Sequence, residues 1–298
     1  MTQSLRENVA AHGVDAATMA SSNNLTFGNI VPHETMGLRG RHWGWWYYAE
    51  YRIRSMRAYW PVLAAYGVLV PVLYLLAMGL GLGTLVDSHT GNVAGVGYLM
   101  FVGPSLLVTT VVMECVSEFT YTVMGNFTWH RIYYGVAATP VSPTMIALGE
   151  LFAVAARMTA QGAVFTLILL VSGNTSSPWA WLMIPIGTLS AMSFGAPLLA
   201  FSATRERDDF SFSFIERFVV MPMFLFAGTF FPLESMPRYL QWIGWISPMW
   251  HGTQLARAAS FSLPLSWPAI LAHLGFLVVT TSVGTWFAIR QFRRRLTR

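Results

Sequence analysis

Six long apolar stretches, separated by shorter polar segments, run along the chain. Each is close to the ~20 residues that an α-helix needs to cross a bilayer. Pro71 and the glycines of segment 79–83 should loosen the first stretch, which neighbouring helices can tolerate. The pattern therefore predicts an all-α integral membrane protein with six transmembrane helices. The predicted spans are 59–82, 98–121, 145–171, 179–203, 215–231 and 267–289, the fifth being short because Glu216 and Arg217 stand at its mouth.

The composition supports this class of protein. The chain is 54% hydrophobic and only 10% charged, whereas soluble domains are about 25% charged. Residues 1–40 contain few large apolar residues and no apolar core of a signal peptide, so we expect a polar cytoplasmic tail there. Residues 41–298 are expected to form a single transmembrane domain.

All 18 basic residues are arginines, and their distribution predicts the orientation of the chain. Arginines accumulate in the cytoplasmic segments of membrane proteins. With six spans, fifteen arginines fall on the side of the two termini, Arg238 and Arg257 fall on the other side, and Arg157 lies inside the third span. Both termini are therefore expected to be cytoplasmic. The same asymmetry explains the net charge of +5 without a nucleic-acid partner.

The absence of lysine excludes several kinds of chemistry. A Walker A loop needs its lysine to hold the nucleotide phosphates, so we do not expect this chain to hydrolyse ATP in that way. The single cysteine, Cys115, excludes an intrachain disulfide and a thiolate metal cluster. His251 and His273 are isolated in the sequence and are expected to be packing residues. No acidic or histidine cluster has metal-ligand spacing, so we predict no cofactor, no metal site and no catalytic residue on this chain.

The segment from Met124 to Pro143 is too polar to lie in lipid. It nevertheless carries apolar residues at near-helical spacing, among them Trp129 and Tyr133. We predict a short amphipathic helix at the membrane surface, closed by Pro140 and Pro143. Since this segment falls on the cytoplasmic side, we interpret it as a lever that receives mechanical work from a partner protein.

Residues 41–60 are dense in aromatic residues and arginines. Two interpretations remain open, an interfacial helix that lies flat before the first span and an aromatic belt at the end of an ordinary span. On a helix, one apolar stripe contains Trp45, Tyr48, Ala49, Ile53, Met56 and Trp60, and the opposite face contains Glu50, Arg54 and Arg57.

The segment that follows the fifth span is apolar and aromatic but interrupted by prolines. We predict two short helices, at about 235–246 and 249–260, that dip into the outer leaflet. Pro237 and Pro248 would suit helix starts, where a missing N–H does no harm. Non-helical backbone at that depth needs protein or water around it, so this broken re-entrant hairpin should line a cavity or an exit.

Four charged residues fall inside the predicted spans. Glu114 and Glu118 share one face of the second span near its cytoplasmic end, Glu150 begins the third span, and Arg157 lies about two turns deeper. A charge inside the bilayer needs a partner, so we expect Arg157 to pair with Glu150 on its own face or with Glu114. Two interpretations stay open, a polar site for a lipid head group or a gate latch, and a purely structural ion pair.

Several segments resemble one family of membrane proteins. Residues 228–258, GTFFPLESMPRYLQWIGWISPMWHGTQLARA, resemble the C-terminal signature of ABC-2 type transporter permeases. Segments 71–83, 128–150 and 293–298 are similar to the branch that contains the permeases of nodulation lipo-oligosaccharide exporters. Daunorubicin-type drug and polysaccharide exporter permeases are relatives of that branch. The likeness extends from about residue 41 to the C-terminus.

The resemblance implies a permease subunit of the bacterial inner membrane that pairs with a second permease protomer. Two separate ATP-binding subunits would carry the ATP and magnesium. Some relatives have an acidic residue where this chain has His130, so no charge pairing is carried over to that position. The implied contact with the ATP-binding subunit is Trp129, His130, Arg131, Ile132, Tyr133, Tyr134 and Ala138; the implied gate helix holds Trp45, Trp46, Tyr48, Arg52 and Met56; the implied exit hairpin holds Phe231, Pro232, Pro237, Trp242, Trp245 and Pro248.

The leading hypothesis is an ATP-driven exporter permease, not an enzyme by itself, that moves an amphipathic lipid-linked, glycolipid or drug-like substrate. One alternative is a membrane-embedded transferase that acts on lipid-linked sugars, for which Glu234 is thin support. The other is a proton-coupled transporter that uses Glu114, Glu118 or Glu150. The sequence identifies neither the cargo nor whether the second protomer is identical.

Overall fold

The structure is a computed structural model that describes residues 33–89, 91, 93–206 and 210–297. Residues 1–32 of the predicted polar tail, 1–40, lie outside this part of the chain, and residues 33–40 of it are the first residues of a helix. The chain divides after Arg39, and the packing described below belongs to the unit from Gly40 onward.

Helices make up the regular structure of the described residues, and the β pairing found among them is an isolated bridge between Val93 and Val96. Five helical runs are long and apolar enough to cross a membrane. They confirm the predicted all-α membrane class and correspond to five of the six predicted spans. The runs are Gly40–His89, Tyr98–Thr128, Pro143–Val171, Ala180–Ser202 and Trp267–Leu296.

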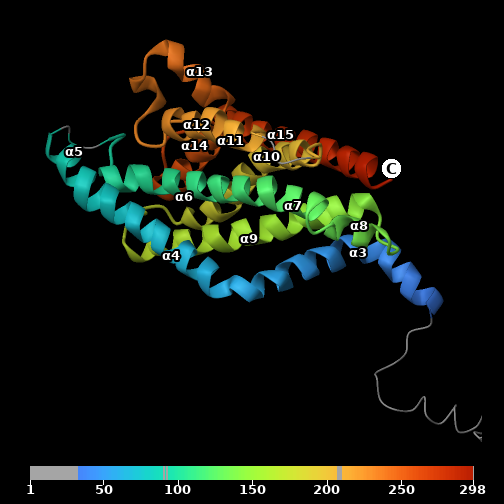
Figure 1. The fold of residues 1–298 in the computed structure, drawn as a ribbon. Coiled ribbons are helices and arrows are strands. Elements are labelled where there is room, and N and C mark those ends of the chain that lie inside the picture. The colour runs from blue at the N-terminus through green and yellow to red at the C-terminus, as the bar shows by residue number, and fades with distance from the viewer. Residues whose placement is uncertain (1–32, 90, 92, 207–209, 298) are drawn as a thin grey trace, which may run out of the picture. The chain divides into compact units, whose positions relative to one another are not determined.

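The first run joins the predicted gate helix to the predicted first span without a break. Helix α3 (His33–Ser55) passes through a 3₁₀ turn, Met56–Tyr59, into α4 (Trp60–Leu76), and the run bends at this joint (Figure 1). A π-helical segment, Ala77–Gly83, then leads into α5 (Thr84–His89). This segment contains the glycines that were expected to loosen the span, and glycine weakens regular α-helical geometry.

The second run is longer than predicted. Helix α6 (Tyr98–Ser117) continues through a π-helical segment, Glu118–Thr122, into α7 (Val123–Thr128). The run thus takes in the first residues of the predicted lever. It ends at a turn where Arg131 has a left-handed backbone, with φ of 52°. Only the six residues of α8 (Ile132–Ala137) form a separate helix.

Helix α9 (Pro143–Val171) begins close to where the sequence predicts the third span. Pro143 lies in its first turn, where the missing N–H does no harm. The side chain of Ser142 accepts a hydrogen bond from the backbone N–H of Met145 at 3.4 Å. Pro143 therefore starts the third span as well as ending the polar segment before it.

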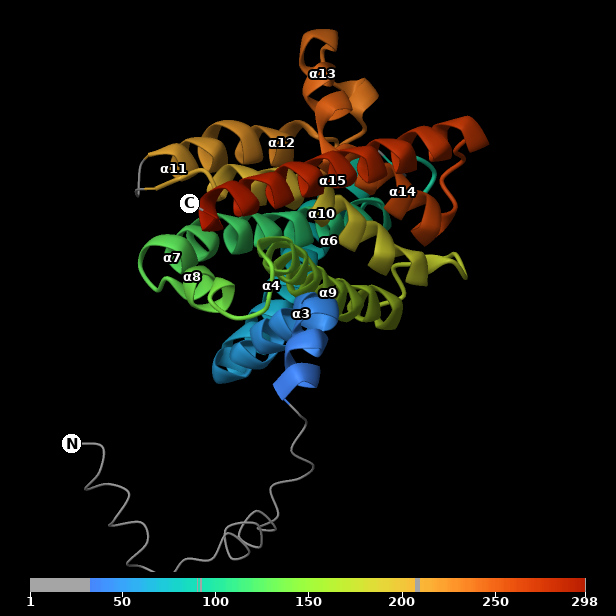
Figure 2. The same cartoon turned by 90° about the vertical axis from the view of Figure 1, so that its right-hand side faces the viewer.

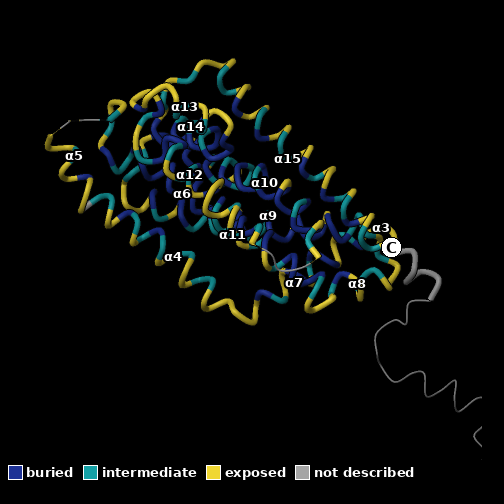
Figure 3. Tube along the Cα trace, turned by 45° about the horizontal axis from the view of Figure 1, so that its top comes forward, coloured by how far each residue is buried: buried dark blue, intermediate teal, exposed yellow. Residues whose placement is uncertain are grey.

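Helix α10 (Met183–Ser202) lies at the centre of the bundle. It packs against α6, α9, α14 (Pro248–Phe261) and α15 (Trp267–Leu296), and a view along the bundle places it among them (Figure 2). In the most apolar window of the second run 78% of the residues are buried, against 11% in that of the first. Figure 3 accordingly shows a buried α6 and an exposed α4. The first span therefore presents apolar surface outside the bundle.

The fifth predicted span is the shortest helical stretch among the six. It consists of α11 (Ser211–Ile215), a π-helical segment (Glu216–Val220) and α12 (Met221–Phe226), 16 residues in all. At 1.5 Å per residue it is ~24 Å long, less than the ~30 Å hydrocarbon core of a bilayer. It ends before the predicted residue 231 because Gly228, with φ of +73°, turns the chain.

Two helices follow this stretch, α13 (Arg238–Ile246) and α14, close to their predicted positions. Pro248 lies in the first turn of α14 as expected, whereas Pro237 precedes α13 as its cap residue. A separate 3₁₀ turn, Leu233–Ser235, takes the residues that were expected to begin the first helix. Helix α13 projects from the bundle (Figure 2), and α14 is buried against α6, α10 and α15.

The two ends of the bundle differ in charge. The arginine-rich end holds α8, the start of α9 and the last turns of α10 and α15 (Figure 1). Arg293 Nε donates to Thr144 Oγ1 at 2.7 Å, and Arg295 donates to the carbonyl of Ala203 at 2.9 Å. The hairpin end holds α5 and α13 (Figure 1). Arg131, Arg293, Arg294 and Arg295, which the sequence assigns to one side, therefore lie at this end.

Helices α10 and α15 approach each other closely at Gly284. A Cβ atom at this position would lie 2.3 Å from Pro197 Cδ and 2.5 Å from Pro197 N. The obstructing atoms belong to a proline ring and its backbone, which cannot turn aside. We predict that Gly284→Ala lowers stability by about 1–3 kcal/mol, the usual range for overpacking, as measured by thermal unfolding in detergent.

Gly275 on the same helix provides the matched control, because nothing lies within 4 Å of a Cβ placed there. Gly275→Ala should leave the melting temperature unchanged or raise it, since alanine favours the helix. Equal melting temperatures for the two variants would contradict the close α10–α15 contact.

Candidate functional site

A buried arginine joins the gate helix to the two spans that carry the acidic residues. Arg52 of α3 donates from Nε to Glu150 Oε1 at 3.0 Å and from Nη2 to Glu118 Oε2 at 3.1 Å. The hydroxyl of Tyr48 donates to Glu150 Oε2 at 2.6 Å. Both oxygens of the fully buried Glu150 carboxylate are thus bonded, as a charge in this position requires.

A second arginine extends this network along α9. Arg157 donates from Nη2 to Glu114 Oε2 at 3.1 Å and from Nη1 to Glu118 Oε1. Glu118 therefore bridges Arg52 and Arg157, and a chain of five charged side chains connects α3, α6 and α9. We call these residues the ionic network: Arg52, Glu114, Glu118, Glu150 and Arg157.

Helical spacing and one glycine bring these residues together. Glu114 and Glu118 are one turn apart, as are Tyr48 and Arg52, so each pair shares a face. Gly149 lets α3 lie directly on α9, since a Cβ there would be 2.5 Å from the carbonyl oxygen of Trp45. This backbone contact places Tyr48 and Arg52 of the gate helix level with Glu150 on α9.

The structure corrects the predicted pairing inside the membrane. The predicted pair of Arg157 with Glu150 is wrong, because Glu150 is taken by Arg52 from the neighbouring helix. The expected partner Glu114 is confirmed. The central position of Glu118 was not anticipated, because sequence spacing within one helix says nothing about α3.

The predicted gate residues divide into a buried and an exposed set. Tyr48, Arg52 and Met56 are buried, and Trp45 and Trp46 place their rings edge-on against Phe152. Two members of the predicted apolar stripe face outward instead: Ile53 is 40% exposed and Trp60 63% exposed. The need of Arg52 to reach buried carboxylates sets the rotation of α3, so Tyr48 and Ala49 of the stripe are buried and Ile53 is not.

The predicted lever has a different internal arrangement from the one expected. Trp129 lies in the turn between α7 and α8 and is 60% exposed, whereas Tyr133 is fully buried. The Tyr133 ring lies 4.5 Å from that of Phe127, 5.2 Å from Phe292 and 6.2 Å from Tyr48, between ring centroids. Burial raises the pKa of Tyr133 above its ordinary value, so the phenol is neutral. The expectation of a continuous surface helix was therefore wrong.

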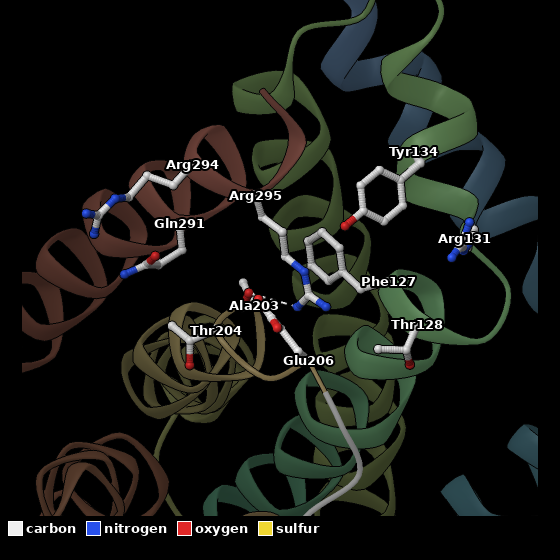
Figure 4. Close-up of a pocket in the computed structure, with 10 residues that line it drawn as sticks. All are labelled: Phe127, Thr128, Arg131, Tyr134, Ala203, Thr204, Glu206, Gln291, Arg294 and Arg295. Atoms are coloured by element: carbon white, nitrogen blue, oxygen red, sulfur yellow. Dashed lines mark hydrogen bonds between the residues drawn. The ribbon is translucent and has the colours of Figure 1, made fainter. Parts of the chain in front are cut away.

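A polar cavity of about 810 Å³ opens beside this turn at the arginine-rich end (Figure 4). Arg295 crosses it: its guanidinium lies 4.1 Å from the Phe127 ring centroid and donates to the carbonyls of Ala203 and Arg205 at 2.9 and 2.6 Å. Arg131 and Arg294 are exposed at the same cavity. The lining residues are Phe127, Thr128, Arg131, Tyr134, Ala203, Thr204, Glu206, Gln291, Arg294 and Arg295.

An arginine that the sequence analysis did not single out holds the hairpin end together. Arg257 of α14 is 1% exposed, and its guanidinium lies 3.6 Å from the Phe101 ring centroid. It donates to the backbone carbonyls of Phe101, Gly228 and Thr229 at 3.2, 2.8 and 3.2 Å. It thereby joins α14 to α6 and to the turn after α12. The sequence did contain a signal for this role, because Arg257 lies in an apolar segment on the side of the membrane that has few arginines.

The two histidines described as isolated are in contact. Burial lowers the pKa of His251 on α14, so its ring is neutral at pH 7. Its Nε2 donates to the carbonyl of Trp245 at 3.0 Å, so its Nδ1 accepts from His273 Nδ1 at 2.8 Å. A hydrogen-bonded chain therefore links α13, α14 and α15. Sequence spacing hides the contact because the rings belong to different helices.

The remaining hairpin residues lie mostly at the surface. Trp242 and Trp245 are exposed on α13, and Phe231 is exposed in the turn after α12. Pro248 is buried at the start of α14. Within the part of the chain that the structure describes, no group of three His, Cys, Asp or Glu residues could hold a metal ion.

These features define a multi-pass helical membrane protein with a network of five charged side chains between its helices. Residues 44–261 match the family model described as ABC-2 type transporter. The chain belongs to the ABC-2 type transporter family.

Individual relatives support the same family. The chain is 28% identical to Nodulation protein J of Neorhizobium galegae over 230 residues, 76% of this chain and 84% of that protein. It is 26% identical to Nodulation protein J of Rhizobium meliloti (strain 1021) over the same shares of both chains. A shorter match, 31% over 112 residues, is to the probable multidrug ABC transporter permease YbhR of Escherichia coli (strain K12), covering 36% of this chain and 28% of that protein.

The ionic network yields a test of its energetic importance. Arg52→Ala would leave the Glu150 carboxylate buried without its cation, and breaking a buried pair in this way costs about 3–5 kcal/mol. We expect a large fall in the melting temperature of the purified protein. Arg54→Ala is the control, because Arg54 forms an exposed pair with Glu50, and exposed pairs contribute about 0–1 kcal/mol. A small effect at both positions would mean that Arg52 does not hold α3 in place.

Arg257 allows a second test, on the hairpin alone. Arg257→Met keeps an unbranched side chain but removes the guanidinium that donates to three carbonyls. Each such bond from a charged donor contributes about 1.5–3 kcal/mol to stability. A change of ~1.4 kcal/mol shifts an equilibrium constant tenfold, so loss of these bonds should raise the population of locally opened hairpin at least tenfold. We therefore expect trypsin to cleave after the exposed Arg238 at least roughly tenfold faster. Cleavage after Arg294, at the other end, should keep its rate; a uniform increase at both sites would point to global unfolding instead.

Proposed function

We propose that this chain is the membrane permease subunit of an ATP-driven exporter. Its family membership and its similarity to a probable multidrug ABC transporter permease support this proposal. The chain contains no lysine for a Walker A loop, so ATP hydrolysis is assigned to a separate ATP-binding subunit that also holds the magnesium. The second permease protomer of the complex is an identical or related chain.

The contact with the ATP-binding subunit is placed at the turn between α7 and α8. The observation that carries this assignment is the exposure of Trp129 in a turn whose neighbours in sequence, Phe127 and Tyr133, pack against each other. An exposed aromatic side chain on a rigid support is typical of a binding hot spot. Arg131 and the cavity beside it supply the polar part of the same surface.

The contacts of Tyr133 suggest how a push on this turn reaches the gate helix. Tyr133 packs against Tyr48, and Tyr48 donates to Glu150, which also binds Arg52. Packed side chains and charge pairs with discrete arrangements are able to transmit displacement between sites. Movement of α8 would thus alter the position of α3 through its buried face.

The proposed orientation places the arginine-rich end in the cytoplasm of a bacterium, within the inner membrane. Six crossings require α11–α12 to span the bilayer in spite of its length, which local thinning of the membrane would permit. Helix α4 and the α11–α12 stretch expose apolar residues such as Val62, Leu69, Phe218 and Leu225. These faces suit lipid and the second protomer.

The cargo of the exporter is proposed to be an amphipathic molecule, either lipid-linked, a glycolipid or drug-like. Its path would follow the exposed faces of the first, second and fifth spans. The hairpin of α13 and α14 would shape the exit, with Trp242 and Trp245 exposed where a lipid-like molecule leaves.

The alternative hypotheses gain no specific support. Glu114, Glu118 and Glu150, suggested for a proton-coupled transporter, each accept a hydrogen bond from an arginine and so take part in ion pairs between helices. Glu234, suggested for a transferase, stands in a 3₁₀ turn of the hairpin.

The docking assignment is tested by the double variant Trp129→Ala with Arg131→Ala, co-expressed with the ATP-binding subunit. Loss of an exposed hot spot should reduce co-purification of that subunit and permease-stimulated ATP hydrolysis by roughly tenfold or more. The purified permease should keep its melting temperature, because neither side chain is buried. Tyr239→Ala, which removes an aromatic that is 73% exposed at the hairpin end, is the control and should bind normally. Undiminished hydrolysis in the double variant would remove this turn from the proposed mechanism.

A further inference from the structure

A second cavity, apolar and distinct from the one beside α8, lies between α4 and α9. Its volume is about 680 Å³, within the range of sites that bind a single small ligand. It begins at the joint between α3 and α4 and extends along both helices towards the hairpin end. We call it the α4–α9 groove.

Small residues create the space of this groove. Ala153, Ala156 and Ala160 lie three and four positions apart on α9 and so share one face. Ala64 and Gly67 face them from α4, and a Cβ placed on Gly67 would meet nothing within 4 Å. Two helices that face each other with such short side chains leave a channel between them, and larger apolar residues such as Trp60, Leu63 and Val164 line the rest of its wall.

One end of the groove is polar. Glu114 is the α6 residue that lines it, and therefore forms its floor between the other two helices. Glu114 Oε2 binds Arg157, whereas Oε1 has no hydrogen-bond partner among the described residues, and 35% of the side chain is exposed. An acceptor carboxylate thus stands at the end of an apolar channel. Arg157, which donates to Glu114 and Glu118, and Gln161 also line the groove. The exposed Arg57 lines its outer edge.

This combination matches one kind of molecule. An alkyl chain would replace water along the alanine walls, and a head group that carries N–H or O–H donors would bond to the open Glu114 oxygen. A protein surface fits less well, because it would have to bury the Glu114 carboxylate against an apolar face. An anionic head group would meet the Glu114 carboxylate, and the neighbouring Arg157 is already paired with both Glu114 and Glu118.

We propose that the α4–α9 groove binds a single-chain amphiphile with an amine or hydroxyl head group, and that Glu114 selects the head group. This assignment rests on the proposed exporter function, because it identifies the chemical class of the cargo. The groove opens at the level where α4 begins, so the molecule would enter from the leaflet at the arginine-rich side with its chain pointing towards the hairpin end.

The test is photo-crosslinking of the purified, reconstituted permease with three probes that carry the same diazirine in an alkyl chain. The probes are sphingosine, palmitic acid and a phosphatidylcholine with two chains. We expect sphingosine to label α9 between Ala153 and Val164 at least about fivefold more than either other probe. Preference for palmitic acid would overturn the head-group assignment, and preference for phosphatidylcholine would show that the groove holds resident bilayer lipid.

Matched variants separate the groove from general lipid contact. Ala160→Trp fills the groove at an exposed position and should abolish the α9 labelling. Leu167→Trp adds the same side chain two turns further along α9, at a residue that is 60% exposed and outside the groove lining, and should leave labelling intact. Equal labelling in both variants would overturn the proposal.

The head-group contact has its own variant. Glu114→Gln keeps the shape of the side chain, and Arg157 retains Glu118 as its partner. It should reduce the preference for sphingosine over palmitic acid to near unity while the melting temperature stays close to that of the parent protein. An unchanged preference would remove Glu114 from the site. Because these measurements need no ATP-binding subunit, failure of docking at Trp129 leaves their outcome unaffected.

Discussion

A carboxylate that is fully buried among helices sets the strongest constraint on this structure. Glu150 must be bonded at both oxygens, since an unpaired charge in that position would be expensive. Its partners, Tyr48 and Arg52, come from α3, a helix that also carries exposed aromatic residues. The bonds to Glu150 hold this helix against the bundle. The position of α3, and with it the start of the first span, follows from this requirement.

The same buried contacts connect regions that differ in role. The aromatic cluster around Tyr133 joins α7, α8 and α15 to Tyr48, and the ionic network continues from there to Arg157. The α4–α9 groove ends at Glu114, the last member of that network. The proposed docking turn, the gate helix and the proposed binding groove are thus linked by direct side-chain contacts within one protomer.

The class of the protein and the positions of its long helices could be predicted from the sequence, because an apolar stretch of ~20 residues is typical of a helix that crosses a membrane. The start of α9 at Pro143 and of α14 at Pro248 followed from the chemistry of proline. Rotation of a helix about its axis was harder to predict. For α3 the apolar stripe pointed to Ile53, yet this residue is exposed because Arg52 turns inward. Trp60 of the same stripe lies beyond the 3₁₀ joint, at the start of α4, and is exposed as well. Contacts between helices, such as His251 with His273, leave no trace in the spacing along one chain.

The direct seating of α3 on α9 at Gly149 has a mechanical consequence. With the carbonyl of Trp45 against a residue that has no side chain, the two helices have no room to slide past each other and should behave as a rigid body. Any rearrangement of the first span would then have to pivot at the 3₁₀ joint of Met56–Tyr59, where α4 leaves this pair. That joint would then act as the hinge, and the swing of α4 about it would set the width of the α4–α9 groove.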